Sequence, residues 1–216
     1  MSFDYHNRLV VSVPWNVSTR KAEAFVASSR DWIRKQMLGL SPVLGLKQYF
    51  DREPWIAIDG RKISVGIRFA SSGRNYWIYQ ERHQQGLFQI NDRSDPAISL
   101  IRLVRDVAKD FLEKRTRYWS EAYSLSVGRV CVRNQSTRWG SCSQSGCISL
   151  NWRLLLLSPG AQDYVILHEL AHLVHLNHSA EFHNFLSSLD PKRSEHEAEL
   201  EERGPLLMRV GRGLAT

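Results

Sequence analysis

Two histidines and a glutamate near residue 170 have the types and spacing needed to bind a metal and to transfer a proton. His168 and His172 stand four residues apart, and Glu169 directly follows the first of them. Residues four apart in a helix lie one turn apart on the same face, so both imidazoles can reach one ion. Zinc suits this pair because it accepts neutral imidazole nitrogen and leaves a position open for water. The motif predicts one catalytic zinc per chain, with Glu169 as the general base that takes the proton of that water.

A motif this short also arises by chance. Both histidines would then be hydrogen-bonded in the core of an amphipathic helix, and Glu169 would lie at the surface. The surrounding sequence favours the metal site, because the segment before the motif is apolar and helical and further histidines follow it.

A catalytic zinc needs a third protein ligand. The candidates that follow the motif are His175, His178, Glu181 and His183. The side chain of His175 lies too far along the helix axis, about 7.5 Å beyond the midpoint of the histidine pair. His178 lies ten residues after His168, the spacing of the metzincin pattern, although His175 replaces the glycine of that pattern. Asn177 tolerates the left-handed conformation that ends a helix, so the chain can turn back there. We predict His178 as the third ligand.

The elements that must position these groups follow from hydrophobic periodicity and from capping residues. Ser158 and Pro159 are an N-cap and a first helical residue, and they open a motif-bearing helix that continues to about Val174. Apolar residues at helical spacing predict one long helix over Pro96–Ala122. Strands are expected at residues 129–133 and 148–157, with a polar loop at 140–146 between them, and a last charged helix starts near Asp190.

The first 95 residues have a more β-rich pattern. A short strand at 9–13 is followed by a helix from about residue 18 to 37, with Ser18 as its N-cap. Residues 55–58 and the alternating 63–69 predict a hairpin around Asp59-Gly60, and 76–79 and 87–90 predict two further strands. The order of elements predicts an α+β protein with a β-rich N-terminal subdomain at 1–95 and a catalytic domain at 96–216, packed as one compact unit.

The net charge of +7 is distributed unevenly. Residues 1–95 carry a net +5, residues 96–153 carry +6, and residues 154–216 carry −4. The basic surface of the first three-quarters is expected to attract polyanions, nucleic acid included. The alternative is that these lysines and arginines only solvate helix faces.

Longer stretches of the sequence resemble one known family. They are the run 137–142 (Thr-Arg-Trp-Gly-Ser-Cys), the run 148–154 (Ile-Ser-Leu-Asn-Trp-Arg-Leu), the motif run 163–172, and Asn177 to Ser179 with Phe182. Together and in this order they resemble the YgjP-like zinc metallopeptidases, which are related to the SprT-like peptidases. The resemblance covers most of the chain, with two departures: His183, where the family is expected to have tryptophan, and Cys147, where it usually has a polar or small residue.

This resemblance implies a minimal zincin-like fold with a small antiparallel sheet, a long backing helix and an active-site helix. It assigns His168, His172 and His178 as zinc ligands and Glu169 as the base, as the spacing does. Some members of the family are described as UTP pyrophosphatases, so the resemblance specifies the site more closely than the substrate.

Four residues are candidates for contacting the substrate: Arg138, Trp139, Asn151 and Arg153. A strand above the active-site helix can align a peptide by strand addition, and residues 148–153 are the expected strand. An arginine there can also bind an oxyanion or a phosphate. The alternative is structural, with the tryptophans in the core and the arginines bonded to loop carbonyls.

Three functions are compatible with these residues. A zinc metallopeptidase acting on a peptide or protein comes first, a nucleotide hydrolase of the UTP pyrophosphatase type second, and a nucleic-acid-associated protein with structural zinc third. Three cysteines, an odd number, favour a reducing compartment rather than a disulfide scaffold. The N-terminal residues lack the layout of a secretory signal and no apolar stretch reaches 18 residues, so we expect a cytoplasmic protein without a membrane span.

Overall fold

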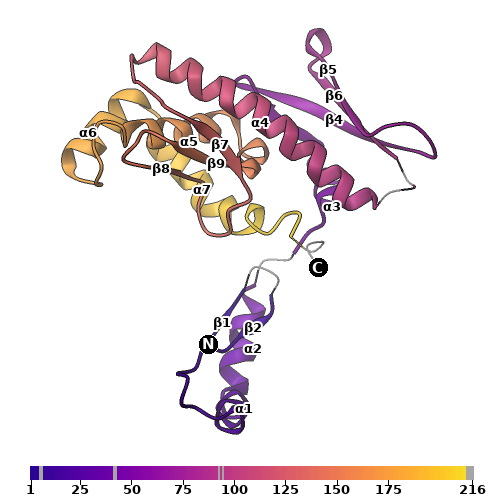
Figure 1. Ribbon diagram of the computed structural model, residues 1–216, viewed down its shortest axis with the longest axis vertical. Helices are drawn as coiled ribbons and strands as arrows, with labels where there is room; N and C mark the ends of the chain where they lie inside the picture. Colours follow the sequence, from indigo (N-terminus) through magenta and orange to yellow (C-terminus); the bar gives the residue numbers. More distant parts are fainter. Residues whose placement is uncertain (5–6, 41–42, 92, 94, 213–216) are drawn as a thin grey trace.

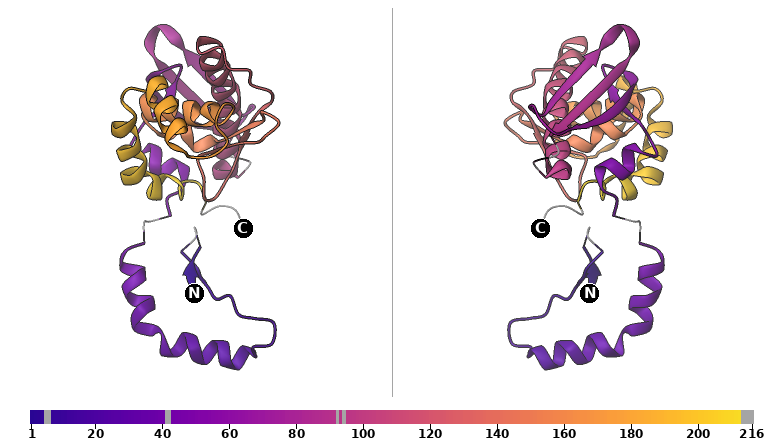
Figure 2. Two further views of the ribbon diagram at one scale, coloured as in Figure 1. Left: turned by 90° about the vertical axis from the view of Figure 1, so that its left-hand side faces the viewer. Right: turned by 90° about the vertical axis from the view of Figure 1, so that its right-hand side faces the viewer.

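The computed structural model describes residues 1–4, 7–40, 43–91, 93 and 95–212. This part of the chain has a mixed α+β fold with seven α-helices and three small sheets. Figures 1 and 2 show a folded body from which an N-terminal arm, residues 1–40, projects. None of the described helices is long and apolar enough to cross a bilayer.

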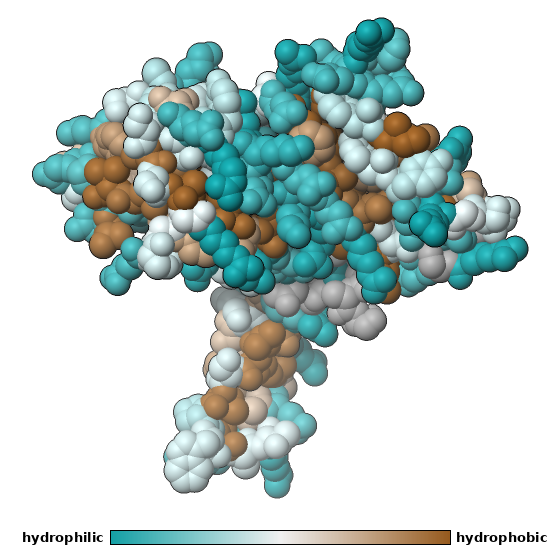
Figure 3. Space-filling view, turned by 45° about the horizontal axis from the view of Figure 1, so that its top comes forward, coloured by the Kyte–Doolittle hydropathy of each residue, from teal (hydrophilic) through white to brown (hydrophobic). Residues whose placement is uncertain are grey.

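The arm contains two short paired strands and two helices. These are β1 (Ser2–Phe3), β2 (Leu9–Val10), α1 (Thr19–Ser28) and α2 (Arg30–Leu38). The prediction of a single helix from about residue 18 to 37 is therefore wrong. The helix is interrupted at Ser29, whose hydroxyl donates to the Phe25 carbonyl oxygen at 2.8 Å. Neither helix buries a residue, and Trp15 and Leu38 are exposed. Figure 3 shows that hydrophobic side chains, in brown, reach the surface of the arm.

The first part of the body is a four-stranded sheet in the order β3-β4-β6-β5, preceded by the short helix α3 (Leu46–Phe50). Its strands are β3 (Trp55–Ile58), β4 (Arg61–Ala70), β5 (Tyr76–Gln80) and β6 (Gln85–Asn91). The predicted hairpin is confirmed, because β3 and β4 pair antiparallel around Asp59 and Gly60, which both have positive φ. The two further strands are also confirmed, although β6 pairs with β4 in parallel.

The long helix α4 (Pro96–Ala122) has the predicted bounds. Asp95 caps it by accepting hydrogen bonds from the backbone N–H groups of Ala97 and Ile98. Its buried face includes Leu100, Val104 and Leu112 and packs against both the first sheet and a second one (Figure 1). A single core cluster joins side chains from both sheets and from the C-terminal helices.

The second sheet positions the candidate site. Its strands are β7 (Val130–Arg133), β8 (Gly140–Cys142) and β9 (Ile148–Asn151), in the order β7-β9-β8. The prediction of an antiparallel sheet is wrong, because β7 runs parallel to β9 and only β8 is antiparallel to it. Residues 140–142, predicted as loop, form its edge strand. The predicted strand at 148–157 ends at Asn151, whose side chain accepts from the Arg153 backbone N–H and starts a short 3₁₀ helix, Trp152–Leu156.

Three helices complete the body. They are α5 (Pro159–Ala171), α6 (Ala180–Leu189) and α7 (Arg193–Leu207). Ser158 caps α5 as predicted, with its hydroxyl oxygen accepting from the Ala161 N–H at 3.2 Å. The helix ends at Ala171, three residues before the predicted end, and His172 is its C-cap.

Candidate metal centre

His168 and His172 come from the last turn of α5. The helix is buried around most of its circumference, so its packing against α4, α7 and β8 fixes the axis and hence the direction of both imidazoles. The two ring centroids lie 5.0 Å apart. The spacing of four residues has therefore placed both rings on one face, as the motif predicts.

His178 reaches the same place through a turn after α5. Backbone N–H groups of Val174 and His175 donate to the Ala171 carbonyl and reverse the chain. The predicted reversal at a left-handed Asn177 is wrong, since Asn177 is not among the described residues with positive φ. The outcome is nevertheless the predicted cluster, in which ligand atoms of His168, His172 and His178 all lie within 4.8 Å of one another.

The geometry of this histidine cluster fits a metal ion. Nε2 of His178 and Nε2 of His168 lie 3.1 Å apart. Two nitrogens at 2.0–2.1 Å from one tetrahedral zinc would lie about 3.3 Å apart, so little movement would be needed. The donor set of three imidazoles suits zinc and other borderline transition metals.

Neighbouring groups orient the His172 imidazole and favour the neutral forms of His168 and His178. The His172 Nδ1–H donates to the His175 carbonyl oxygen at 3.0 Å, which leaves Nε2 of His172 free to bind an ion. Burial, together with the positive charges that His172 and His178 can carry, lowers the pKa of His168 to about 4. Burial likewise lowers the pKa of His178, followed by the charges of His172 and His183. Neutral imidazole is the form that binds metal.

Phe182 packs against all three histidines of the cluster. It is fully buried on α6, and its ring centroid lies 5.1, 4.6 and 4.8 Å from those of His168, His172 and His178. One aromatic side chain thus contacts all three histidines and holds α6 against the end of α5.

Glu169 lies beside the cluster and beneath β8. Its side chain is buried, and burial raises its pKa to about 7, while the charge of Arg138 lowers it. A carboxyl group with such a pKa can both take and release a proton near neutral pH. The approach to β8 requires glycine at residue 140, because a Cβ there would lie 2.5 Å from Glu169 Oε1.

Sequence reasoning assigned no role to Gly140. The available signal was a glycine within the run 137–142, since glycine in a strand often marks the close approach of another group.

A small cavity opens next to Glu169 and His168. Its volume is about 220 Å³. Besides these two residues it is lined by Trp139, Gly140, Tyr164, Val165 and Leu200. The walls are mainly apolar, and Tyr164 and Leu200 are further residues that the sequence reasoning missed.

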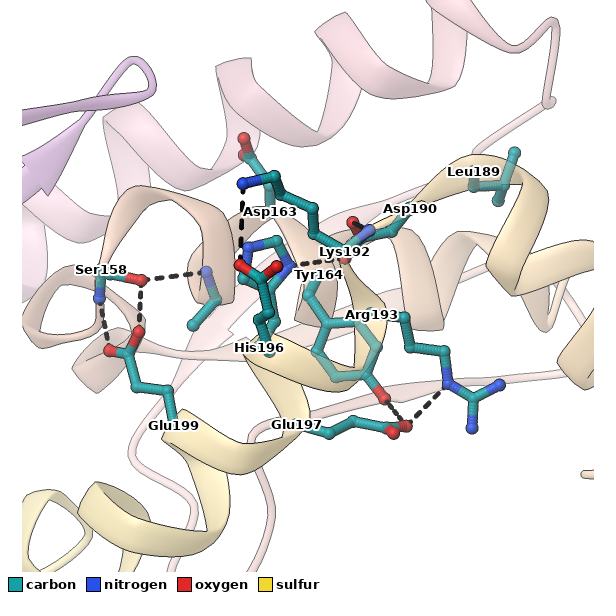
Figure 4. A network of polar contacts seen from close by, with 12 residues as sticks. Ser158, Asp163, Tyr164, Leu189, Asp190, Lys192, Arg193, His196, Glu197 and Glu199 are labelled. Carbon is teal, nitrogen blue, oxygen red and sulfur yellow. Dashed lines mark hydrogen bonds and ion pairs between the residues drawn. The ribbon is translucent and has the colours of Figure 1, made fainter.

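Helix α7 holds α5 in position through polar contacts (Figure 4). The Tyr164 hydroxyl donates to Glu197 at 2.7 Å, and Nε of Arg193 donates to the same carboxylate at 2.8 Å. At the N-terminus of α5, Glu199 accepts from the Ser158 backbone N–H at 2.8 Å. These carboxylates anchor α5 at its start and near its middle, and Tyr164 of the Glu197 network contacts His168, with ring centroids 6.0 Å apart.

The four predicted substrate residues fall into two groups. Arg138 is exposed and Trp139 lines the cavity, so both lie at the site. Asn151 and Arg153 are fully buried and bond within the protein. The Asn151 amide donates to the Arg138 carbonyl at 3.1 Å, and Arg153 Nε donates to the Val210 carbonyl at 2.9 Å. Their placement favours the structural alternative, in which Asn151 fixes the loop that carries Arg138.

The remaining candidates lie outside the histidine cluster. Glu181 is exposed at the start of α6, and the His183 ring lies 6.3 Å from that of His178 without joining the ligand atoms. Asp163, the first residue of the motif run 163–172, forms a two-point ion pair with Arg115 of α4 at 2.7 and 2.6 Å, so its contacts are structural. The three cysteines, Cys131, Cys142 and Cys147, are unpaired.

The arrangement is typical of metallopeptidase domains: one helix carries two histidines and a buried carboxylate, and a third histidine follows from the next turn. The family model described as "YgjP-like, metallopeptidase domain" matches residues 1–203. The chain therefore belongs to the YgjP-like metallopeptidase family, which confirms the resemblance seen in the sequence.

Two solved structures are similar to part of the chain. One is the metallopeptidase zymogen abylysin of Pyrococcus abyssi, with 23% identity, a TM-score of 0.39, and coverage of 43% of this chain and 93% of that chain. The other is the metallopeptidase zymogen jannalysin of Methanocaldococcus jannaschii, with 19% identity, a TM-score of 0.38, and coverage of 43% and 95%. No curated protein sequence matches the chain significantly.

Proposed function

We propose that this protein is a zinc-dependent peptidase that binds one zinc ion per chain through His168, His172 and His178. The observation that carries the proposal is the buried side chain of Glu169, held beside the three histidines without joining their cluster of ligand atoms. A structural zinc site needs a fourth protein ligand, whereas a catalytic site keeps a position for water. The described His/Cys/Asp/Glu side chains supply three ligands to this cluster.

Bound zinc would supply a Lewis acid that polarises a carbonyl oxygen and acidifies water. The residues of the chain do the rest. Glu169 takes the proton of the attacking water and passes it to the leaving amine, which its raised pKa of about 7 suits. Burial of Glu169 under Gly140 keeps the carboxylate in one orientation and excludes bulk water from one side.

The surroundings of the site favour a peptide as substrate. Residues 148–153 were expected to align a peptide by strand addition. Strand β9 cannot do so, because β7 and β8 occupy both of its edges. The edge next to Glu169 is β8, and no other described strand pairs with its outer side. An extended peptide bonded there would pass the cluster. The apolar cavity with Trp139 and Leu200 on its wall would accept an apolar side chain beside the cleaved bond.

One observation favours the second candidate, a nucleotide hydrolase of the UTP pyrophosphatase type. Arg138 is exposed and close enough to lower the pKa of Glu169, so a cation stands at the mouth of the site. An arginine there could bind a phosphate of the nucleotide. The apolar cavity wall does not suit a triphosphate, so the peptidase is the preferred function.

The test is Glu169→Gln, which keeps the shape of the side chain but cannot take a proton. The variant should retain one zinc per chain by metal analysis, while hydrolysis falls by roughly two to four orders of magnitude. Unfolded casein and UTP serve as parallel substrates, and the one that wild type hydrolyses identifies the reaction. Loss of zinc in the variant would make Glu169 a ligand, and unchanged activity with zinc bound would exclude it as the base. A wild-type protein that binds zinc and hydrolyses neither would favour the third candidate, a nucleic-acid-associated protein with structural zinc.

A further inference from the structure

The basic residues of the middle of the chain gather on one groove, which lies between the exposed face of α4 and the strand β7. Two adjoining hollows of about 260 and 300 Å³ form it, and both are lined by Lys109 and Val132. The groove is lined by five exposed basic side chains: Arg102, Arg105, Lys109, Arg129 and Arg133. Helix α4 and strand β7 run side by side there (Figure 1).

The charges in this basic groove are not neutralised within the protein. Across the part of the chain that the structure describes, none of the five cationic groups forms an ion pair. Two acids also line the groove, Asp106 and Glu113, and Glu113 is itself paired with Arg117 at 3.0 Å. Side chains that only solvate a surface usually alternate in sign, whereas here one sign predominates along a concave surface.

A buried cation behind the groove adds to this positive field. Arg153 is fully buried, and its Nη2 has no hydrogen-bond partner among the described residues. Burial, followed by the positive charges of Arg212 and Arg105, lowers its pKa to about 8. Arg105 belongs to the groove, so an anion bound at Arg105 would offset part of this unfavourable charge.

The dimensions of the groove fit a phosphate backbone. Arg102 and Lys109 lie seven residues apart on one helix, about 10 Å, and Arg129 and Arg133 lie four residues apart along a strand, about 13 Å. Along the axis of a duplex each strand has one phosphate per about 3.4 Å, so a groove parallel to that axis would face three or four phosphates of one strand. Four of the five cations are arginines, whose planar guanidinium groups bind phosphate through two hydrogen bonds. No aromatic side chain lines the groove, so contacts would go to the backbone rather than to stacked bases.

We propose that the groove between α4 and β7 binds the phosphate backbone of a nucleic acid without regard to base sequence. Strands β7 and β8 are opposite edges of the second sheet with β9 between them, which separates the groove from the edge beside Glu169 by about 10 Å. Nucleic acid in the groove would leave the metal centre accessible. The proposal is independent of the hydrolytic function.

The test compares two triple variants that lose the same charge. Arg102→Ala/Arg105→Ala/Lys109→Ala removes one wall of the groove, and alanine is favourable in a helix. The control, Arg20→Ala/Lys21→Ala/Arg34→Ala, removes three exposed cations from helices α1 and α2 of the arm. Binding of a labelled 20-nucleotide single strand, and of the same sequence as a duplex, is measured by fluorescence anisotropy between 50 and 200 mM salt.

Wild type should bind both oligonucleotides and lose about 20- to 40-fold in affinity over this salt range, as release of counterions from about three phosphates requires. The groove variant should bind about tenfold or more weakly at 50 mM salt with a shallower salt dependence, and the arm control should stay within about threefold of wild type. Polyglutamate at equal charge concentration should compete less well than the duplex, because a duplex carries one charge per about 1.7 Å of its axis and extended polyglutamate only about one per 3.3 Å.

Three results would overturn the proposal: no binding by wild type at 50 mM salt, equal weakening in both triple variants, or equal competition by polyglutamate. Zinc content and melting temperature of the groove variant verify its fold, and Lys109→Glu alone provides a second, milder variant. Glu169→Gln should bind nucleic acid as wild type does, so failure of the enzymatic mechanism and failure of this proposal remain distinguishable.

Discussion

Replacing Gly140 with alanine tests how closely Glu169 is held against β8. The added Cβ would lie 2.5 Å from Glu169 Oε1, 2.6 Å from its Cγ and 2.8 Å from its Cδ. Nonbonded carbon and oxygen atoms need about 3.4 Å or more, so the carboxylate must move by roughly 1 Å or the strand must shift. A displacement of about 1 Å at a catalytic group costs on the order of 100-fold in rate.

The expected result is a selective loss. Hydrolysis by Gly140→Ala should fall by about 100-fold in kcat, with zinc content near one per chain because the three atoms nearest to the new methyl group all belong to Glu169. Overpacking should lower the free energy of unfolding by about 1–3 kcal/mol. Steady-state kinetics, metal analysis and thermal unfolding separate these effects.

Gly204→Ala is the matched control. Gly204 is buried in α7, where the atoms nearest to an added Cβ belong to the Trp139 side chain at 3.6 Å, an ordinary contact. This variant should keep full activity, and its free energy of unfolding should change by less than about 1 kcal/mol, because the higher helix propensity of alanine is offset by the cost of a Cβ directly before Pro205. Unimpaired hydrolysis by Gly140→Ala with its zinc and fold intact would refute either the position of Glu169 or its role as the base.

Three further predictions concern the metal and the packing of α5. His178→Ala should sharply weaken zinc retention, measured by competition with a chelator. His175→Ala should not, because His175 contacts the His172 ring through its backbone carbonyl oxygen. Zinc loss in the His175 variant and retention in the His178 variant would make His175 the third ligand. Removing the metal with a chelator should lower the melting temperature by roughly 5–10 °C, taking the metal at about 100 times its Kd; no shift in calorimetry would mean that the folded state binds no metal. Asp163→Asn should reduce the free energy of unfolding by about 3 kcal/mol, because it leaves the mostly buried Arg115 without its partner. Its zinc content should stay unchanged. If urea unfolding gives a free energy within about 0.5 kcal/mol of wild type, the ion pair contributes little to stability.

The local elements of this protein could be predicted because each depends on residues close in sequence. The four-residue spacing of His168 and His172 places both rings on one face of any helix that forms there. The limits of α4 and the start of α5 follow from capping residues, and the Asp59-Gly60 hairpin follows from turn residues that accept positive φ. Backbone geometry and capping act within one or two turns, so a sequence alone is enough to show them.

What the sequence could not decide depends on which distant segments meet. Residues 140–142 become a strand only because β9 offers them an edge, and Gly140 acquires its role only because α5 lies beneath it. Arg153 was a substrate candidate by its motif, but the approach of the C-terminal residues near Val210 buries it. The basic groove likewise exists only where α4 meets β7. Local periodicity contains no information on such contacts, because they are determined by how the side chains of separate elements fill the shared core.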